Sequence, residues 1–198
     1  MLKIGAQLEL NVCPHCGVNT PNLPLHTQLD TKNAEKTKKM TWGVYICKRC
    51  GGVVTALAEK MGSEVISYFP AAPEVDEALP ERAKVYLYQA FQSIHAPAGA
   101  VMLVASAVDA MLKEKGLVSG SLYSRIDLAE RDGIITKDMA VWAHEVRLDA
   151  NDQRHADQDA PLPTLEDAKR AIDFAAAIGQ FLFVLPARIK KGLQSSLS

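Results

Sequence analysis

Three polar side chains that could act together on a phosphate follow one another at intervals of four residues. They are Arg147, Asn151 and His155, within the segment 141–157. If this segment is helical, Arg147 and His155 lie about 80° apart around the axis and roughly 12 Å apart along it. A guanidinium binds phosphate or carboxylate through a fork of donors, and an imidazole transfers protons near neutral pH. The pattern indicates a strip of candidate site residues and leaves open whether they converge.

Four cysteines in two C-x-x-C pairs form a second candidate site. They are Cys13, Cys16, Cys47 and Cys50. A glycine follows each pair and permits the positive φ that such a turn often needs. Two such turns complete a tetrahedral site of four sulfurs, which suits zinc with Zn–S distances of about 2.3 Å. Close pairs in a cytoplasmic chain favour metal over disulfides. Free thiols or a redox pair are the less favoured alternative, and His15 and His26 are not expected to be ligands.

The composition excludes several classes of protein. The chain has 198 residues, 48% of them hydrophobic, and a formal net charge of −1. No global field attracts nucleic acid, so a site for a polyanion must be a local patch. Because no uninterrupted apolar run of about 18 residues and no leader-like start are present, we expect a cytoplasmic protein without a membrane span. A Gly-rich phosphate loop, a G-x-S-x-G turn and an H-E-x-x-H pair are also missing, which disfavours nucleotide-binding, hydrolase and zinc-protease functions.

Residues 1–70 are predicted to form a small zinc-ribbon-like β module. Strands are expected over 41–47, 52–60 and 63–69. The polar segment 20–40 has no apolar period and predicts a flexible insertion. Its lysines, with Lys48 and Arg49, make a basic cluster that is either a phosphate-contact surface or, as we favour, a solvated loop. Since so few apolar residues cannot hold a fold alone, a metal would supply much of the folding energy.

Residues 71–80 are rich in proline and acidic side chains and predict a linker, after which residues 81–198 follow a helical period. Helices are expected over 81–94, 100–115 and 121–131, then from Thr136 through the candidate strip, and finally from Thr164 to Pro186, a kink or a stop. A polar turn is expected over 156–163. The fold class is therefore mainly α, a bundle of four to five helices after the β module.

Three features of this bundle can be predicted more closely. The second helix is apolar nearly all round, which indicates the buried centre. Asp109, the charge within it, is expected to pair with a cation of a neighbouring helix. In the helix that follows Thr136, we expect Val141, His144 or Glu145, and Leu148 to face the core. The apolar second and last helices also predict a homodimer.

Three stretches carry a resemblance to a known family: DAMLKEKGLVSGSLYSRIDLAERDGIIT, WAHEVRLDANDQRH and TLEDAKRAIDFAAAIGQFLFVLP. They resemble the bacterial domain-of-unknown-function-4145 family, which is linked to the HEPN superfamily of helical bundles. CPHCG and CKRCGG look like the knuckles often found at the front of its members. The resemblance covers about Cys13 to Pro186. It implies an HEPN-like α bundle, often dimeric and sometimes found beside or fused to restriction and other defence proteins.

Related HEPN domains include metal-independent ribonucleases, in which an Arg and a His meet across a dimer axis and the 2′-hydroxyl of RNA attacks. Carried onto this chain, Arg147 would bind the scissile phosphate, His155 would be the acid or base, and Asn151 would orient these two side chains. Seven residues separate Arg147 from His155, where ribonuclease members have four to six. Ser106 stands where such members often carry an arginine.

Three hypotheses therefore stay open. The first, which the sequence favours, is a zinc-containing, non-catalytic module that associates with RNA, DNA or a protein partner from a defence system. The second is an RNA endonuclease that uses Arg147, Asn151 and His155. The third is a structural hydrogen-bond network that joins these groups to Asp109 or Asp149 and clamps the helix to its neighbours.

Overall fold

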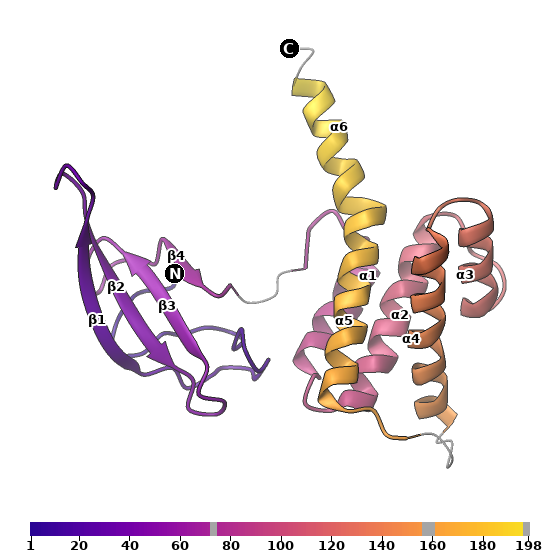
Figure 1. Cartoon of the computed structure of the whole chain (residues 1–198), viewed down its shortest axis with the longest axis horizontal. Helices are drawn as coiled ribbons and strands as arrows, with labels where there is room; N and C mark the ends of the chain where they lie inside the picture. Colours follow the sequence, from indigo (N-terminus) through magenta and orange to yellow (C-terminus); the bar gives the residue numbers. More distant parts are fainter. Residues whose placement is uncertain (72–74, 156–160, 196–198) are drawn as a thin grey trace. The chain divides into compact units, whose positions relative to one another are not determined.

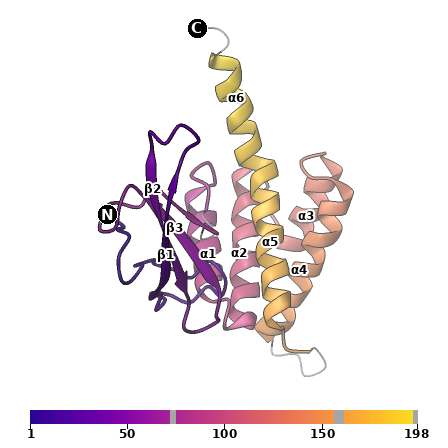
Figure 2. The same cartoon turned by 60° about the vertical axis from the view of Figure 1, so that its left-hand side comes forward.

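The structure, a computed structural model, describes residues 1–71, 75–155 and 161–195. They divide into two compact units, Met1–Glu74 and Val75–Ser198, drawn in Figure 1 and, turned by 60°, in Figure 2. Residues 72–74 of the predicted linker lie outside the described residues, as do residues 156–160 of the polar turn expected after His155.

The first unit is built on an antiparallel sheet in the order β1-β2-β3-β4. The strands are β1 (Leu25–Lys32), β2 (Lys39–Ile46), β3 (Val53–Ala58) and β4 (Ser67–Phe69). In β2 alternate side chains are buried, as its pattern of apolar and polar residues dictates. Tyr45, fully buried, fixes the sheet to the N-terminal segment because its hydroxyl donates to the Gly5 carbonyl at 3.0 Å.

The prediction of a flexible insertion over residues 20–40 is wrong in part, because residues 25–46 form the β1–β2 hairpin. Its turn is held by the Asn33 side chain, which accepts from the Lys38 N–H at 2.8 Å. Asp30 on β1 forms an ion pair with Lys39 on β2 at 2.8 Å. Most of β1 is exposed on both faces, so the strand lacks the apolar alternation by which a half-buried strand is recognised.

The hairpin also divides the basic cluster expected from the sequence. The lysines at residues 32–39 lie around the turn at one end of β2, whereas Lys48 and Arg49 follow its other end. Eight residues of strand at about 3.3 Å each span about 26 Å. These side chains therefore do not form one phosphate-contact patch.

The second unit contains five helices within its described residues, and the last of them is continuous through a π-helical turn. Their bounds are α1 (Glu81–Gln92), α2 (Pro97–Glu114), α3 (Leu122–Arg131), α4 (Lys137–His155), α5 (Leu165–Gly179), η1 (Gln180–Val184) and α6 (Leu185–Ser195). α2 packs against α1, α3, α4 and α5, with buried residues from Ala100 to Leu112 on several sides. The prediction that α2 is the centre of the bundle is confirmed.

The prediction of which face of α4 meets the core is wrong. Val141 and Leu148 are 53% and 49% exposed. The buried residues are Ala140, Ala143, Val146 and Ala150. Three alanines let α4 approach α2 closely, because a small side chain keeps two helix axes near each other. Arg147 borders this buried row, so its side chain starts at the edge of the helix interface.

The helix starts expected at Thr136 and Thr164 are confirmed, whereas α2 begins at Pro97, three residues before the start expected at residue 100. Thr136 accepts from the Met139 N–H at 3.2 Å at the start of α4. Thr164 and Asp167 form a reciprocal capping box at the start of α5, in which each side chain satisfies a free backbone N–H of the first turn. Pro186 does not stop the last helix. It is the second residue of α6, directly after the π-helical turn, where a proline's missing N–H is more easily accommodated.

The continuous helix Leu165–Gln194 is long and apolar enough to cross a membrane by length and composition alone, with 39% of its most apolar window buried. The expectation of no membrane span was based on uninterrupted apolar runs, and this helix meets a less strict criterion that tolerates a few charged residues. Its buried side packs on α2, as the core helix of a bundle also does.

Candidate functional site: a metal centre and a cationic pocket

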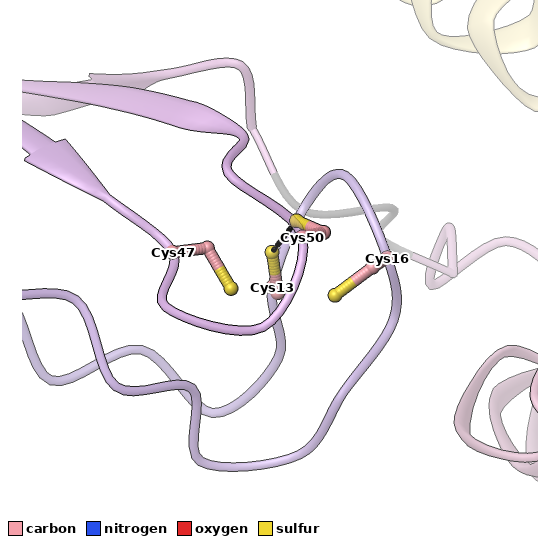
Figure 3. Close-up of side chains that lie close together, drawn as sticks. All are labelled: Cys13, Cys16, Cys47 and Cys50. Carbon is pink, nitrogen blue, oxygen red and sulfur yellow. Dashed lines mark hydrogen bonds between the residues drawn. The ribbon is translucent and has the colours of Figure 1, made fainter.

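The two cysteine pairs sit on turns with the same backbone hydrogen bonds. The Cys13 carbonyl accepts from the Gly17 N–H at 2.9 Å, and the Cys47 carbonyl accepts from the Gly51 N–H at 2.8 Å. Gly17 and Gly51 have φ values of 68° and 73°, which confirms the predicted need for glycine. Both turns therefore present their sulfurs in the same way, and Figure 3 shows the four side chains converging.

The four sulfurs lie close enough together to hold one metal ion. All lie within 4.8 Å of one another, and the Sγ atoms of Cys13 and Cys50 are 4.0 Å apart. A tetrahedron with Zn–S distances of about 2.3 Å has edges of about 3.8 Å. The donor set fits a tetrahedral thiophilic metal, and Cys13 and Cys47 are buried where they anchor it to the core of the first unit.

Protons on these thiols compete with a metal. Burial raises the pKa of Cys13, and it raises the pKa of Cys16 to about 12. Burial acts in the same direction on Cys47, but hydrogen bonds from the backbone of Cys50 and Arg49 bring its pKa below the ordinary value. Metal binding needs thiolates, so it releases protons and weakens as the pH falls.

His15 has a structural role outside the cysteine cluster. It is not part of the four-cysteine cluster, and its Nε2 lies 2.7 Å from the Val53 carbonyl oxygen. A Cβ at Gly52 would come 2.4 Å from the His15 ring, so the imidazole lies flat against the second turn. The expectation that His15 is not a ligand agrees with this position, and His15 joins the first turn to the start of β3.

A cationic pocket lies among four helices of the second unit. It has a volume of about 480 Å³. Its charged lining residues come from every one of these helices: Arg82 from α1, Asp109 and Lys113 from α2, Arg125 from α3, and Arg147 and Arg154 from α4. Five cations and one carboxylate leave a formal excess of four positive charges, in a chain whose net charge is −1.

Asp109 organises one side of this pocket. Its carboxylate forms ion pairs at 2.6 Å with Arg125 and at 2.6 Å with Lys113, which confirms the expected pairing with a neighbouring helix. Arg125 is only 8% exposed, and it also donates to the Val118 carbonyl at 3.3 Å. These two cations are therefore already partly neutralised within the bundle.

Arg147 contacts an aromatic ring rather than a carboxylate. Its guanidinium carbon lies 5.1 Å from the centre of the Tyr123 ring, within the range of a cation–π contact. Its Nε is buried without a hydrogen-bond acceptor among the described residues. Tyr123 in turn contacts the ring of His144 at 4.8 Å, and His144 Nε2 lies 2.9 Å from Asp127. The Arg147 side chain is therefore held in place while one of its donors stays unsatisfied.

Of the three candidate site residues on α4, only two line the pocket. Arg147 and Asn151 both line the pocket, together with Arg154 from the next turn. α4 is helical without a break through His155, which lies exposed at its C-terminal end and is not part of the lining. Helical spacing places Arg147, Asn151 and Arg154 on one side. Arg154 was not predicted as a site residue, although this spacing could have identified it.

Asp149, a suggested partner of the strip, lies on α4 outside the pocket lining. Partial burial and the carboxylates of Asp167 and Asp152 raise its pKa. Because the pKa is higher in the folded state, the free energy of unfolding falls as the pH rises from the pKa of the unfolded state to that of the folded state. The side chain is nevertheless exposed and solvent screens the repulsion, so Asp149→Asn should stabilise the bundle by only a few tenths of a kcal/mol at pH 7.

The same substitution should leave the free energy of unfolding unchanged below about pH 3, where the carboxyl is protonated in both the folded and the unfolded state. Urea unfolding of the helical unit at the two pH values measures the difference. A stabilisation of equal size at both would show that charge repulsion is not its cause.

The profile described as "Domain of unknown function (DUF4145)" matches residues 87–196, more than half of the chain. The chain belongs to this family. The DUF4145 match spans most of the bundle, including Arg147, Asn151 and His155, and begins after the cysteine turns. No curated protein matches the chain, and no solved structure does.

Proposed function

We propose that this DUF4145 protein is a zinc-containing, non-catalytic module that binds nucleic acid, with the phosphate site in the arginine pocket of its helical unit. The observation that carries the proposal is the excess of four positive charges in one pocket of an otherwise slightly acidic chain. Such local concentration of cations is the electrostatic footprint of a polyanion site.

The types of side chain favour phosphate as the bound group. No hydrogen bond or ion pair joins Arg82, Arg147 or Arg154 to another of the described residues. Guanidinium groups bind phosphate oxygens through two parallel donors. Tyr123 lines the pocket and is 50% exposed, and aromatic rings beside arginines stack the bases of single strands. Single-stranded RNA is therefore the first ligand to test.

Zinc is the metal that this proposal assigns to the four cysteines. Four thiolates in tetrahedral arrangement favour zinc among the common divalent metals. Its task would be to hold the first unit folded, because a closed site of four protein ligands leaves no position for substrate. The nucleic-acid site is thus assigned to the helical unit alone.

A metal-independent HEPN-type ribonuclease remains the second candidate, because Arg147 and Asn151 share the pocket. A general acid or base must come within about 3 Å of the proton that it transfers. The exposed position of His155 outside the lining means that catalysis would need the imidazole of a second copy. The position of His155 therefore favours binding over cleavage.

Fluorescence anisotropy with a labelled single-stranded RNA tests the proposed function. Arg147→Gln with Arg154→Gln should weaken binding about tenfold or more and reduce the salt slope by about two, since each lost phosphate contact lowers it by about one. Arg131→Gln is the matched control, because Arg131 is an exposed cation of α3 outside the lining and should leave the affinity unchanged.

The same RNA, run on a denaturing gel after incubation without divalent metal, should be intact. Absence of binding at low salt would reject the proposal. Cleavage that His155→Ala abolishes would replace it with the ribonuclease.

The proposal also includes a cytoplasmic homodimer that acts beside a protein partner from a defence system. Paired cysteines kept for metal are typical of a reducing compartment. Val141 and Leu148 on α4 and Leu185, Ile189 and Leu193 on α6 are exposed apolar side chains that a second copy would cover. Light scattering at micromolar concentration should give twice the chain mass, and a monomer would reject the dimer.

A further inference from the structure

We propose that the arginine pocket is specific for the terminal phosphate monoester of a nucleotide, either a free mononucleotide or the phosphorylated end of a strand. This inference rests on the proposed function and names the group that the pocket recognises. A binder of internal backbone would instead contact phosphodiesters along an open surface.

The charge of the pocket fits a monoester better than a diester. A phosphate monoester carries about −1.5 to −2 at pH 7, whereas a diester carries −1. Asp109 already takes up charge from Arg125 and Lys113, which leaves Arg82, Arg147 and Arg154 for the ligand. Three guanidinium groups that line one pocket are best neutralised by the phosphate with the higher charge, and a third terminal oxygen would offer each arginine an acceptor.

The size of the pocket fits one nucleotide. A volume of about 480 Å³ lies within the range of about 300–1,000 Å³ for sites that enclose small molecules. The α2 residues Ala105, Ser106 and Asp109 lie in the same lining as the arginines of α1 and α4, so four helices line an open pocket. A base could stack on Tyr123 while the phosphate reaches the guanidinium groups.

Arg147 brings an unsatisfied hydrogen-bond donor to the pocket. Its Nε is buried and lacks an acceptor among the described residues, and an unsatisfied buried donor is costly. The guanidinium is held against Tyr123, so little freedom is lost when an anion binds. A phosphate oxygen that reached this Nε after a small shift of the side chain would complete the hydrogen bonding of Arg147.

Competition binding with matched ligands tests this inference on the full chain. The ligands are one RNA oligonucleotide with a 5′-phosphate, the same RNA with a 3′-phosphate, the same RNA with hydroxyls at both ends, and free AMP. We expect at least one phosphorylated end to bind about tenfold more tightly than the hydroxyl form. Arg147→Lys keeps the charge but removes Nε and the fork, so it should bring the affinities for the phosphorylated and the hydroxyl RNA to within about twofold of each other.

The melting temperature of Arg147→Lys should equal that of the wild type, and Arg131→Gln should keep the preference. Equal affinity for all three RNAs would overturn the terminal-phosphate specificity and leave the proposed function in place. Binding of AMP, competed by inorganic phosphate, without any binding of RNA would support the monoester pocket, identify a free nucleotide as the source and reject the nucleic-acid function. Failure of every ligand to bind would reject both.

Discussion

Cys47→Ser should release the metal and unfold the Met1–Glu74 unit, while the Val75–Ser198 unit keeps its own melting transition. Cys47 is 1% exposed and belongs to a small core whose other large side chains include Ile4, Leu8 and Tyr45. Structural zinc contributes roughly 10–16 kcal/mol of apparent binding free energy, more than the few kcal/mol that such a core supplies. The helical unit has a separate core, from Leu79 to Val184.

Metal analysis of the purified chain should fall from about one zinc per chain to less than about a tenth, and NMR amide signals of the sheet should collapse. His15→Asn is the control, because it removes the hydrogen bond to Val53 and leaves all four sulfurs. It should retain the metal. A wild-type protein that is folded and free of metal would contradict the assignment of the cysteines.

Asp109→Ala should destabilise the helical unit by about 3 kcal/mol, near the lower end of what is lost when one partner of a buried ion pair is removed. Arg125, 9% exposed at its side chain, would lose its acceptor, whereas Lys113, 46% exposed, would turn to solvent. Thermal unfolding followed by circular dichroism should show a midpoint about 10 °C or more below that of the wild type.

Asp132→Ala provides the comparison, because Asp132 pairs with Arg131 at the surface. An exposed pair contributes about 0–1 kcal/mol. The double variant Asp109→Leu with Arg125→Met should recover most of the loss, since apolar side chains of similar size replace a buried pair at little cost. Equal losses at Asp109 and Asp132 would show that burial of the pair is not the cause.

Local signals allowed the cysteine cluster and the starts of α4 and α5 to be predicted. The cysteine spacing, the glycine after each pair and the capping residues Thr136 and Thr164 act within a few residues, and the structure has them where expected. Asp109 was also predictable, because a carboxylate in an apolar helix requires a cation. Its partner Arg125 was not, since the choice of neighbouring helix depends on packing.

Features that depend on packing were missed. β1 is polar on both faces and is held by its ladder with β2, so hydrophobic periodicity could not reveal it. α4 turns its alanines inward and leaves Val141 and Leu148 outside, because close helix approach outweighs the burial of larger side chains. Arg82 joins the pocket from α1, a helix far from the strip in the chain.

The Nε–H signals of the arginines, followed by NMR during titration with single-stranded RNA, test most directly whether the pocket is the phosphate site. The account predicts that the signals of Arg147 and Arg154 shift and saturate at the RNA concentration where anisotropy saturates, while the signal of Arg131 stays unchanged. Binding seen by anisotropy without any change at Arg147 and Arg154 would contradict it, because the nucleic acid would then lie elsewhere on the chain.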